Sequence, residues 1–282
     1  MALLWSGTLT RMQVEASDPV AYALQDALPG PEGTPIQPLN GLIGRLVSLR
    51  FTGEIRCVAC GIVSERVYDN GYCQSCFHTR ADADFCMMRP ELCHHGDPDK
   101  PCRDEVYAQE RCFQPHYLYA ALTHDVKVGI TRHTNVPMRW LNQGAVAAIT
   151  LAELPSRRAV GLVEHALAQH VRDRTHWMRM LRAQPDEALL DAAVPEIEAL
   201  FESLNLPGLL PPERRIRARF RYPITTLPEK IRSLSLDRAT ALEGTLLGMK
   251  GQYWILDSGV IHVGRHSGYG VRLYVDEAAP GV

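Results

Sequence analysis

The sequence predicts an α+β protein with β segments at its N- and C-termini, an inserted zinc ribbon, and a central domain with the element order β-β-α-β-α. Three features lead to this prediction: β-like runs near both ends, two Cys-x2-Cys pairs, and a middle part in which strand and helix periodicities alternate. We expect five segments. They are a β segment at 1–56, a zinc-binding module at 57–112, the central domain at 113–182, an acidic helix at 183–210 and a C-terminal β domain at 211–282.

The N-terminal segment contains two β-like runs, at 7–14 and 42–51, which a proline- and glycine-rich loop at 29–38 separates. The phrase NGLIGRL, which begins at residue 40, resembles EGTLLG, which begins at residue 243. This likeness suggests that N-terminal and C-terminal strands join in one β unit, with the middle of the chain inserted between them.

Two cysteine pairs form the motif with the clearest chemistry. A Cys-x2-Cys turn aims two sulfurs at one ion, and twelve residues separate the pairs, which are Cys57 with Cys60 and Cys73 with Cys76. Four thiolates repel one another, and a divalent zinc ion offsets that repulsion. Disulfides would need an oxidising compartment, whereas the N-terminus lacks the pattern of a secretory signal. We therefore expect a structural zinc ion and a cytoplasmic protein.

The following stretch, up to residue 112, is polar and irregular and holds four more cysteines: Cys86, Cys93, Cys102 and Cys112. A segment with so few apolar residues cannot build a hydrophobic core, so it needs another interaction, such as a bound metal ion, to hold it together. A second zinc ion is one interpretation, with these four thiolates as ligands or with His94 in place of one of them. The alternative is that some of these cysteines are buried free thiols.

The central domain contains two strand-like runs joined by a tight turn, a short helix, a third strand and a longer helix that Ser156 caps. We expect the first two strands at 116–122 and 126–131, with their turn at 123–125. The short helix should lie at 136–144, the third strand at 145–154, and the last helix from Ser156 to about 171. This gives the order β-β-α-β-α.

Glu164 lies at the edge of an apolar stripe on that last helix. It is either a boundary residue paired with an arginine or a metal ligand. A site with a single carboxylate suits Mg²⁺, because this ion keeps most of its waters and needs few protein oxygens.

Charge is segregated along the chain, although the formal net charge is only −2. Residues 111–182 carry ten Lys and Arg against four Asp and Glu, whereas residues 183–210, which we expect to include a packing helix, carry six acids and no bases. Farther on, RIRARFRY alternates as a strand does and forms an arginine comb on one face: Arg215, Arg217, Arg219 and Arg221. The comb either protects an edge strand from aggregation or binds phosphates.

In the C-terminal part, β-like runs alternate with glycines, and Asp257-Ser258-Gly259 is typical of a hairpin turn. This pattern predicts a small barrel or sheet. No stretch of the chain approaches the roughly twenty apolar residues that span a bilayer. We therefore expect no membrane partner.

The stretch HYLYAALTHDVKVGITR, followed by PMRW and GLVEHAL, resembles the GIY-YIG nuclease superfamily over roughly residues 116–180. More broadly, the phrases DADFCMMRPELCHH, VKVGITR, RWLNQGA and GMKGQYWI resemble an uncharacterised bacterial domain-of-unknown-function family. That family spans nearly the whole chain and joins zinc-binding cysteines to a nuclease-like core. The narrower resemblance implies a metal-dependent cleavage of phosphodiester bonds in DNA or RNA.

The resemblance makes Tyr117-Leu118-Tyr119 the counterpart of the superfamily's first motif. It makes Lys127-Val128-Gly129 the counterpart of the second motif. The resemblance makes Arg139 the helix arginine that stabilises developing negative charge and Glu164 the ligand of the metal that holds the phosphate. It implies that a tyrosine helps to deprotonate the attacking water. Tyr117 replaces a glycine of the motif and Lys127 replaces a tyrosine, so the candidate catalytic residues are Tyr119, Lys127, Arg139 and Glu164.

Three functions follow as hypotheses. The first is a zinc-stabilised, Mg²⁺-dependent endonuclease that acts on DNA or RNA. The second is a non-catalytic nucleic-acid-binding protein, in which the nuclease-like fold serves as a platform and the ribbon and the arginine comb, together with Arg132, contact the nucleic acid. The third is a protein-interaction scaffold, because a zinc ribbon often only fixes a surface.

Overall fold

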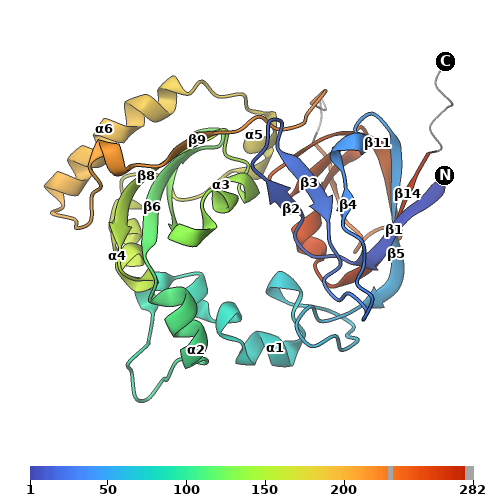
Figure 1. Ribbon diagram of the computed structural model, residues 1–282, viewed down its shortest axis with the longest axis horizontal. Coiled ribbons are helices and arrows are strands. Elements are labelled where there is room, and N and C mark those ends of the chain that lie inside the picture. The colour runs from blue at the N-terminus through green and yellow to red at the C-terminus, as the bar shows by residue number, and fades with distance from the viewer. Residues whose placement is uncertain (228–230, 277–282) are drawn as a thin grey trace. The chain divides into compact units, whose positions relative to one another are not determined.

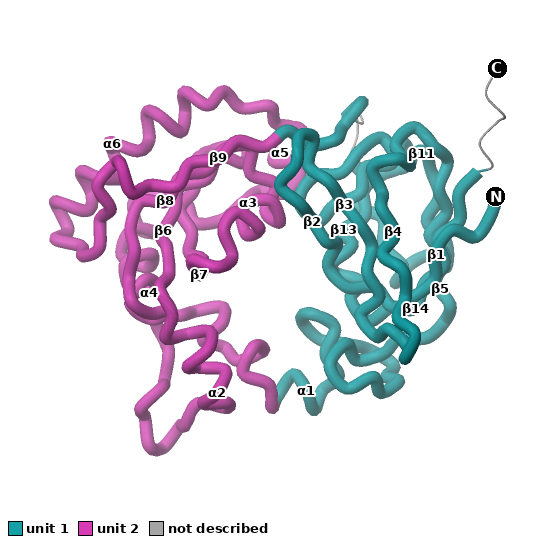
Figure 2. Tube along the Cα trace, in the orientation of Figure 1, with its two compact units in different colours: residues 1–78, 221–282 teal, residues 79–220 magenta. Residues whose placement is uncertain are grey.

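The computed structural model describes residues 1–227 and 231–276, which belong to two compact units (Figures 1 and 2). Unit 1 combines Met1–His78 with the chain from Arg221 onward, and unit 2 is Thr79–Phe220. Strands dominate the first unit, and the second combines strands with helices. The predicted α+β class is confirmed.

Unit 1 is built on a seven-stranded sheet with the order β1-β14-β5-β11-β12-β13-β10. In that order its strands are Ala2–Thr8, Tyr269–Val275, Leu46–Ile55, Ala241–Lys250, Tyr253–Leu256, Gly259–His262 and Ser233–Leu234. Neighbours are antiparallel except β10 and β13, which are parallel. Strand β5 lies between β14 and β11, so the expectation that both ends of the chain build one β unit is confirmed.

Apolar side chains from both ends of the chain fill the core of this unit. Leu49 of β5, Leu246 of β11 and Leu273 of β14 are completely or almost completely buried. The predicted hairpin turn is confirmed, because Leu256 pairs with Gly259 across it. A second, smaller sheet has the order β2-β3-β4, with strands Gln13–Glu15, Ala21–Leu24 and Gln37–Pro38.

Unit 2 contains a four-stranded antiparallel sheet with the order β7-β6-β8-β9. Its strands in that order are Val126–Arg132, His116–Leu122, Ala147–Leu154 and Arg217–Arg219. Strands β6 and β7 form the predicted hairpin, and in its turn the Thr123 amide donates to the Asp125 carbonyl at 3.2 Å. Strand β9 is an edge strand, so one side of its backbone pairs with no strand of residues 1–227 and 231–276.

Helices cover both faces of this sheet (Figure 1). The helices that follow the first strand of the sheet in the chain are α3 (Met138–Asn142), α4 (Arg157–Leu167), α5 (Trp177–Arg182) and α6 (Ala188–Ser203). Two further short helices, α1 (Gln74–Thr79) and α2 (Glu105–Tyr107), precede the sheet in the chain. Val160 and Val163 of α4 pack with Phe201 of α6 on one face, and Trp140 of α3 packs on the other. Ser156 caps α4 as predicted, since its Oγ accepts from the Ala159 amide at 3.2 Å.

Between α1 and β6 the chain forms a series of turns that we call the cysteine module, residues 79–112. It consists mainly of one-turn helical pieces and contains no β-strand. The module packs on α4, where Pro90 contacts Gly161 so closely that a Cβ atom on the glycine would lie 2.6 Å from the proline ring. Gly161 is therefore required by packing and not by backbone conformation.

No helix within residues 1–227 and 231–276 combines the length and the apolar character needed to cross a bilayer.

We predict that Gly161→Ala destabilises the protein. Alanine favours a helix by about 1 kcal/mol, but overpacking against Pro90 costs about 1–3 kcal/mol, so the net effect is a loss. Urea unfolding at constant zinc concentration measures it. Gly41→Ala is the matched control, because a Cβ atom there meets nothing within 4 Å. A Gly161→Ala protein as stable as the control would contradict the predicted packing.

Candidate functional site

Tyr119 lies in the middle of β6 and is completely buried on the face that Trp140 covers. Its hydroxyl donates a hydrogen bond to Gln143 Oε1 at 2.8 Å, and its ring meets that of Trp140 edge-on, with 5.9 Å between the ring centroids. Across the ladder it pairs with Gly129, where a Cβ atom would lie 2.6 Å from the hydroxyl oxygen. Gly129 therefore leaves the space that this tyrosine occupies.

Lys127 lies on β7, where its side chain is 5 % exposed and its ammonium group donates to the carbonyl oxygen of Asp173 at 2.8 Å. Burial lowers the pKa of Lys127 to about 8, and the positive charge of Arg139 acts in the same direction. The carboxylates of Glu164 and Asp173 oppose this shift. Near neutral pH part of the Lys127 population is uncharged, so this amine is able to accept a proton.

Arg139 and Glu164 reach the same region from α3 and α4. The Arg139 Nε atom is buried and has no hydrogen-bond partner among the described residues. Burial raises the pKa of Glu164, while the charges of Lys127, Arg139 and Arg157 act against this. Burial also raises the pKa of Tyr119, and Arg139 opposes that shift as well. The structure thus brings together Tyr119, Lys127, Arg139 and Glu164 closely enough for their charges to interact.

The charges in this group, which we call the Glu164 cluster, do not balance. Two carboxylates, those of Glu164 and Asp173, act in this group together with the cations of Lys127, Arg139 and Arg157. With all five groups charged, one positive charge is left over, and this excess, together with the Arg139 Nε that has no partner among the described residues, favours an anionic ligand such as a phosphate.

A metal ion at Glu164 would bind few protein groups. Within the described part of the chain, no set of three His, Cys, Asp or Glu ligand atoms includes Glu164. One carboxylate, with water in the other positions, is a donor set that Mg²⁺ accepts and that structural zinc does not. Glu164 alone among these residues could therefore supply an oxygen ligand to such an ion.

Two further residues belong to this site: Gln143, which was not predicted, and Arg157, which was expected only as one of three arginines that could pair with Glu164, the others being Arg158 and Arg172. Gln143 follows Arg139 by four residues and Arg157 precedes Glu164 by seven, which places each about one or two helical turns from a predicted site residue. This helical spacing is the feature of the sequence by which both residues could have been assigned to the site.

The four ribbon cysteines lie in unit 1 and gather around one point, since their sulfur atoms all lie within 4.8 Å of one another. The Sγ atoms of Cys60 and Cys73 are 3.8 Å apart. In a tetrahedral zinc site with Zn–S bonds of about 2.3 Å, the sulfur atoms lie about 3.8 Å apart. The donor set and its size therefore fit a zinc ion bound by Cys57, Cys60, Cys73 and Cys76.

The backbone favours the thiolate form of one of these cysteines, Cys57, whereas burial and the neighbouring cysteines raise the pKa of Cys76 to about 12. Burial opposes ionisation of Cys57, but the amides of Cys73, Cys60 and Ala59 outweigh it and lower the pKa of Cys57 to about 6. Gly61 has a φ of +73° in the turn that follows the first cysteine pair. Four cysteine ligands leave no open coordination position for water, so the ribbon is suited to a structural role and not to catalysis.

The other four predicted metal ligands lie in the cysteine module of unit 2. All of them line one enclosed cavity of about 20 Å³: Cys86, Cys93, Cys102 and Cys112. Their sulfur atoms are not gathered as in the ribbon, because among the described residues no three of these four cysteines have sulfurs within 4.8 Å of one another. The close set of ligand atoms in the module is that of Asp84, Cys86 and His94. Arg132, predicted to contact nucleic acid, is partly buried and lies near Cys112.

The arginine comb is engaged in ion pairs. Arg215, Arg217 and Arg219 pair with carboxylates of α6 or of the residue before it, namely Glu198, Asp191 and Glu187. Arg221 pairs with Asp18 at 2.8 Å in unit 1. The side chain of Arg215 is only 8 % exposed, whereas those of Arg219 and Arg221 are 70 % and 68 % exposed. The acidic helix and the basic strand thus neutralise each other in part.

We predict that Cys76→Ser removes one zinc ion per chain, because serine cannot supply the fourth thiolate. Zinc content by elemental mass spectrometry, together with thermal unfolding, measures the effect. Ala59→Ser is the control, since it adds a hydroxyl on an exposed residue of the same turn and keeps all four sulfurs. Equal zinc content in Cys76→Ser and wild type would contradict the assignment of this site.

Comparison with protein families and with known proteins completes the description of the site. No curated protein and no solved structure matched the sequence. A family model described as a protein of unknown function, DUF2797, matches residues 44–271, which include the zinc ribbon, the cysteine module and the Glu164 cluster. Since this match covers most of the 282 residues, the chain belongs to the DUF2797 family of proteins of unknown function.

Proposed function

We propose that the protein is a zinc-stabilised, Mg²⁺-dependent endonuclease that cleaves phosphodiester bonds in DNA or RNA. The observation that supports this proposal is the Glu164 cluster, in which the carboxylates of Glu164 and Asp173 act with three cations on the GIY-YIG-like sheet and helices. Phosphodiester cleavage needs such an arrangement, because negative charge grows on the phosphate in the transition state.

Each residue of the cluster has a role in this proposal. Arg139 donates to a phosphate oxygen through the Nε atom that has no partner among the described residues. Glu164 would hold Mg²⁺, which when bound supplies a Lewis acid for the phosphate and the leaving oxygen. Lys127 accepts a proton from the attacking water, since burial makes its neutral form accessible. Tyr119 and Gln143 fix the position of α3 through their hydrogen bond.

Nucleic acid contacts outside the cluster are proposed for the exposed part of the arginine comb. Arg219 and Arg221 keep most of their side-chain surface in water despite their ion pairs, and surface pairs of this kind are weak. A phosphate is therefore able to compete for these guanidinium groups. Arg215 is too enclosed by Glu198 and the Leu210 carbonyl to take part.

A second candidate function is binding of nucleic acid without cleavage. It is favoured by the engagement of both groups that would move protons, because the Tyr119 hydroxyl is completely buried and the Lys127 ammonium group is bound to the Asp173 carbonyl. In this case the cluster holds a phosphate, and affinity falls steeply with salt as counterions are released.

We predict that Glu164→Gln lowers Mg²⁺-dependent cleavage by about a hundredfold or more, because the metal ligand and its charge are lost. The measurement uses purified protein with labelled single-stranded and double-stranded DNA and RNA. Glu202→Gln, the same change on an exposed residue of α6, is the control and keeps full activity.

The same samples separate the two candidate functions. Wild-type protein that binds the nucleic acids in a salt-dependent way but cuts none of them supports the non-catalytic function. Wild-type protein that neither binds nor cuts any of them overturns both, and equal cleavage by wild type and Glu164→Gln removes the assigned site.

We predict that the kcat/KM of cleavage rises about tenfold per pH unit below pH 8 and levels off above it, if neutral Lys127 is the base. The sign follows from the pKa of Lys127, which burial and the charge of Arg139 lower to about 8, so that the neutral form gains population as pH rises through this value. Lys127→Arg stays protonated and loses the inflection. The same inflection in Lys127→Arg would contradict the role of Lys127.

A further inference from the structure

The cysteine module has almost no hydrophobic core of its own. Of residues 79–112, all of which the structure describes, four are buried: Ala81, Asp84, Pro90 and Ala108. Larger apolar side chains of the module are exposed, such as Met88 at 74 % and Val106 at 66 %. Three small apolar residues are too few to hold the segment, so another interaction must hold its turns together.

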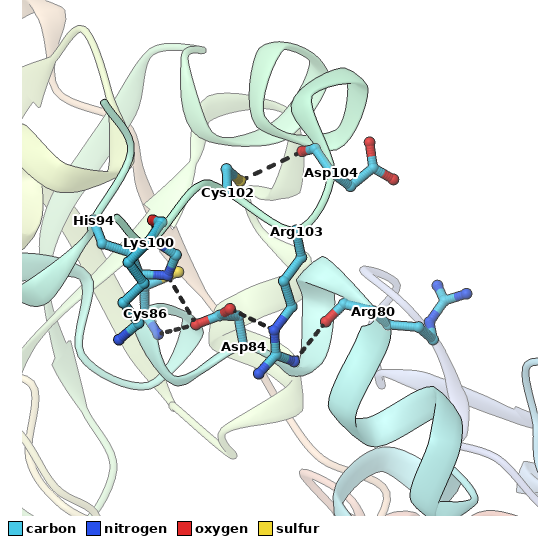
Figure 3. Close-up of polar contacts among 8 residues, drawn as sticks. All are labelled: Arg80, Asp84, Cys86, His94, Lys100, Cys102, Arg103 and Asp104. Atoms are coloured by element: carbon cyan, nitrogen blue, oxygen red, sulfur yellow. Dashed lines mark hydrogen bonds and ion pairs between the residues drawn. The ribbon is translucent and has the colours of Figure 1, made fainter. Parts of the chain in front are cut away.

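Asp84 is the buried acidic residue of this segment, with 7 % of its surface exposed. Its Oδ2 atom pairs with Arg103 Nε at 2.7 Å, and its Oδ1 atom accepts from the Cys86 amide at 3.2 Å (Figure 3). By the second contact the aspartate caps a short helical turn, and this places Cys86 beside the same carboxylate. Contacts on both oxygens therefore fix the direction of the carboxylate.

His94 presents a lone pair to the same carboxylate oxygen. Its Nδ1 atom lies 2.7 Å from the Lys100 carbonyl oxygen, which can only accept, so Nδ1 is a protonated ring nitrogen. In the neutral ring Nε2 then carries the lone pair, and this atom lies 3.4 Å from Asp84 Oδ1 (Figure 3). A histidine that ligates a metal is commonly held in this way, with its other nitrogen donating to a backbone carbonyl.

The ligand atoms of Asp84, Cys86 and His94 all lie within 4.8 Å of one another. An ion pair closes to about 2.7–2.9 Å, as Asp84 does with Arg103, so the 3.4 Å between Asp84 and His94 is long for a direct hydrogen bond. In a tetrahedral zinc site with Zn–N and Zn–O bonds of about 2.0–2.2 Å, the nitrogen and oxygen ligands lie about 3.4 Å apart. The spacing therefore fits two ligands of one ion.

The other cysteines of the module lie outside this set. Within residues 1–227 and 231–276, the close set of ligand atoms that includes Cys86 holds no second cysteine. The Cys102 thiol donates to the Asp104 carbonyl oxygen at 3.5 Å, as the protonated form does (Figure 3). Of the four thiolates expected from the sequence at a second site, this geometry retains Cys86 alone.

We propose that Asp84, Cys86 and His94 bind a second zinc ion through Oδ1, Sγ and Nε2, and that a water molecule completes its coordination. Zinc takes oxygen, sulfur and nitrogen ligands, and one carboxylate with one thiolate balances its charge. Asp84 and Cys86 line an enclosed cavity of about 20 Å³, which has room for about one water molecule. The site is distinct from the ribbon, because its ligands lie in unit 2, and it does not depend on nuclease activity.

The ion would close a loop whose middle packs on α4. Asp84 and Cys86 precede this part of the loop and His94 follows it. Between them, the Met87 carbonyl accepts from Arg157 Nη2 at 2.6 Å, and Pro90 lies against Gly161. A cross-link that fixes both ends of a short loop reduces the entropy of its open state. The ion therefore stabilises the surface that the module presents to α4.

The test counts zinc in the full-length protein by elemental mass spectrometry. Wild type is expected to bind two zinc ions per chain, and His94→Ala one. His95→Ala is the matched control and keeps two, because this neighbouring ring pairs with Glu105 instead. Cys102→Ser is also expected to keep two, whereas a site made of four thiolates would lose one ion.

Cobalt(II) in place of zinc reports thiolate ligands through its sulfur-to-metal charge-transfer absorption. In Cys76→Ser, where the ribbon ion is lost, this absorption is expected to fall to about one fifth, because one of five thiolate ligands remains. A fall to about one half would indicate four thiolates at the second site and would overturn the proposed ligand set.

Three zinc counts would also overturn the proposal. One zinc ion per chain in wild type excludes a second site, and two in His94→Ala exclude this histidine as a ligand. Loss of an ion in Cys102→Ser excludes the set of three ligands. The wild-type count and the cobalt spectrum decide the matter even where His94→Ala does not fold, and none of these readouts requires nucleic acid.

Discussion

The constraint on which this structure depends is the cost of holding charge away from water. Four cysteine sulfurs in unit 1 lie within 4.8 Å of one another, and a divalent ion would make such an arrangement of thiolates favourable. In unit 2 the carboxylates of Glu164 and Asp173 lie among the cations of Lys127, Arg139 and Arg157, and the charges do not cancel. A zinc ion could balance the first group, and an anionic ligand would balance the second.

The arginine comb shows the opposite solution, in which charges are matched within the protein. The strand β9 is three residues long, and the carboxylates before and along α6 lie beside its arginines, so that Arg217 meets Asp191 at 2.6 Å. The segregation of charge along the sequence is thus in part a pairing of two neighbouring elements. A run of basic residues is by itself weak evidence for a nucleic-acid surface, and buried, unpaired donors such as Arg139 Nε are stronger evidence.

Much of the fold was predictable because local chemistry determines it. The cysteine spacing, the turn at 123–125 and the cap at Ser156 depend on neighbouring residues, and the structure confirms the turn and the cap. The likeness of two distant phrases even indicated that β5 joins the C-terminal strands. Helical spacing places Gln143 and Arg157 near predicted site residues, but their hydrogen bonds, from the Tyr119 hydroxyl to Gln143 and from Arg157 to the Met87 carbonyl, depend on tertiary packing that no local pattern encodes.

The position of Glu164 illustrates how two packing demands define one chemical group. Val160 and Val163 hold α4 to the sheet, and Gly161, between them in sequence, receives Pro90 of the cysteine module. A helix with only one packed face could rotate about its axis, whereas contacts on two faces fix the direction of the side chains between them. Because Gly161 has no side chain, Pro90 is able to lie directly against α4. A mostly buried carboxylate that must meet three cations needs such a fixed helix, so the module's packing on α4 is part of the site's architecture.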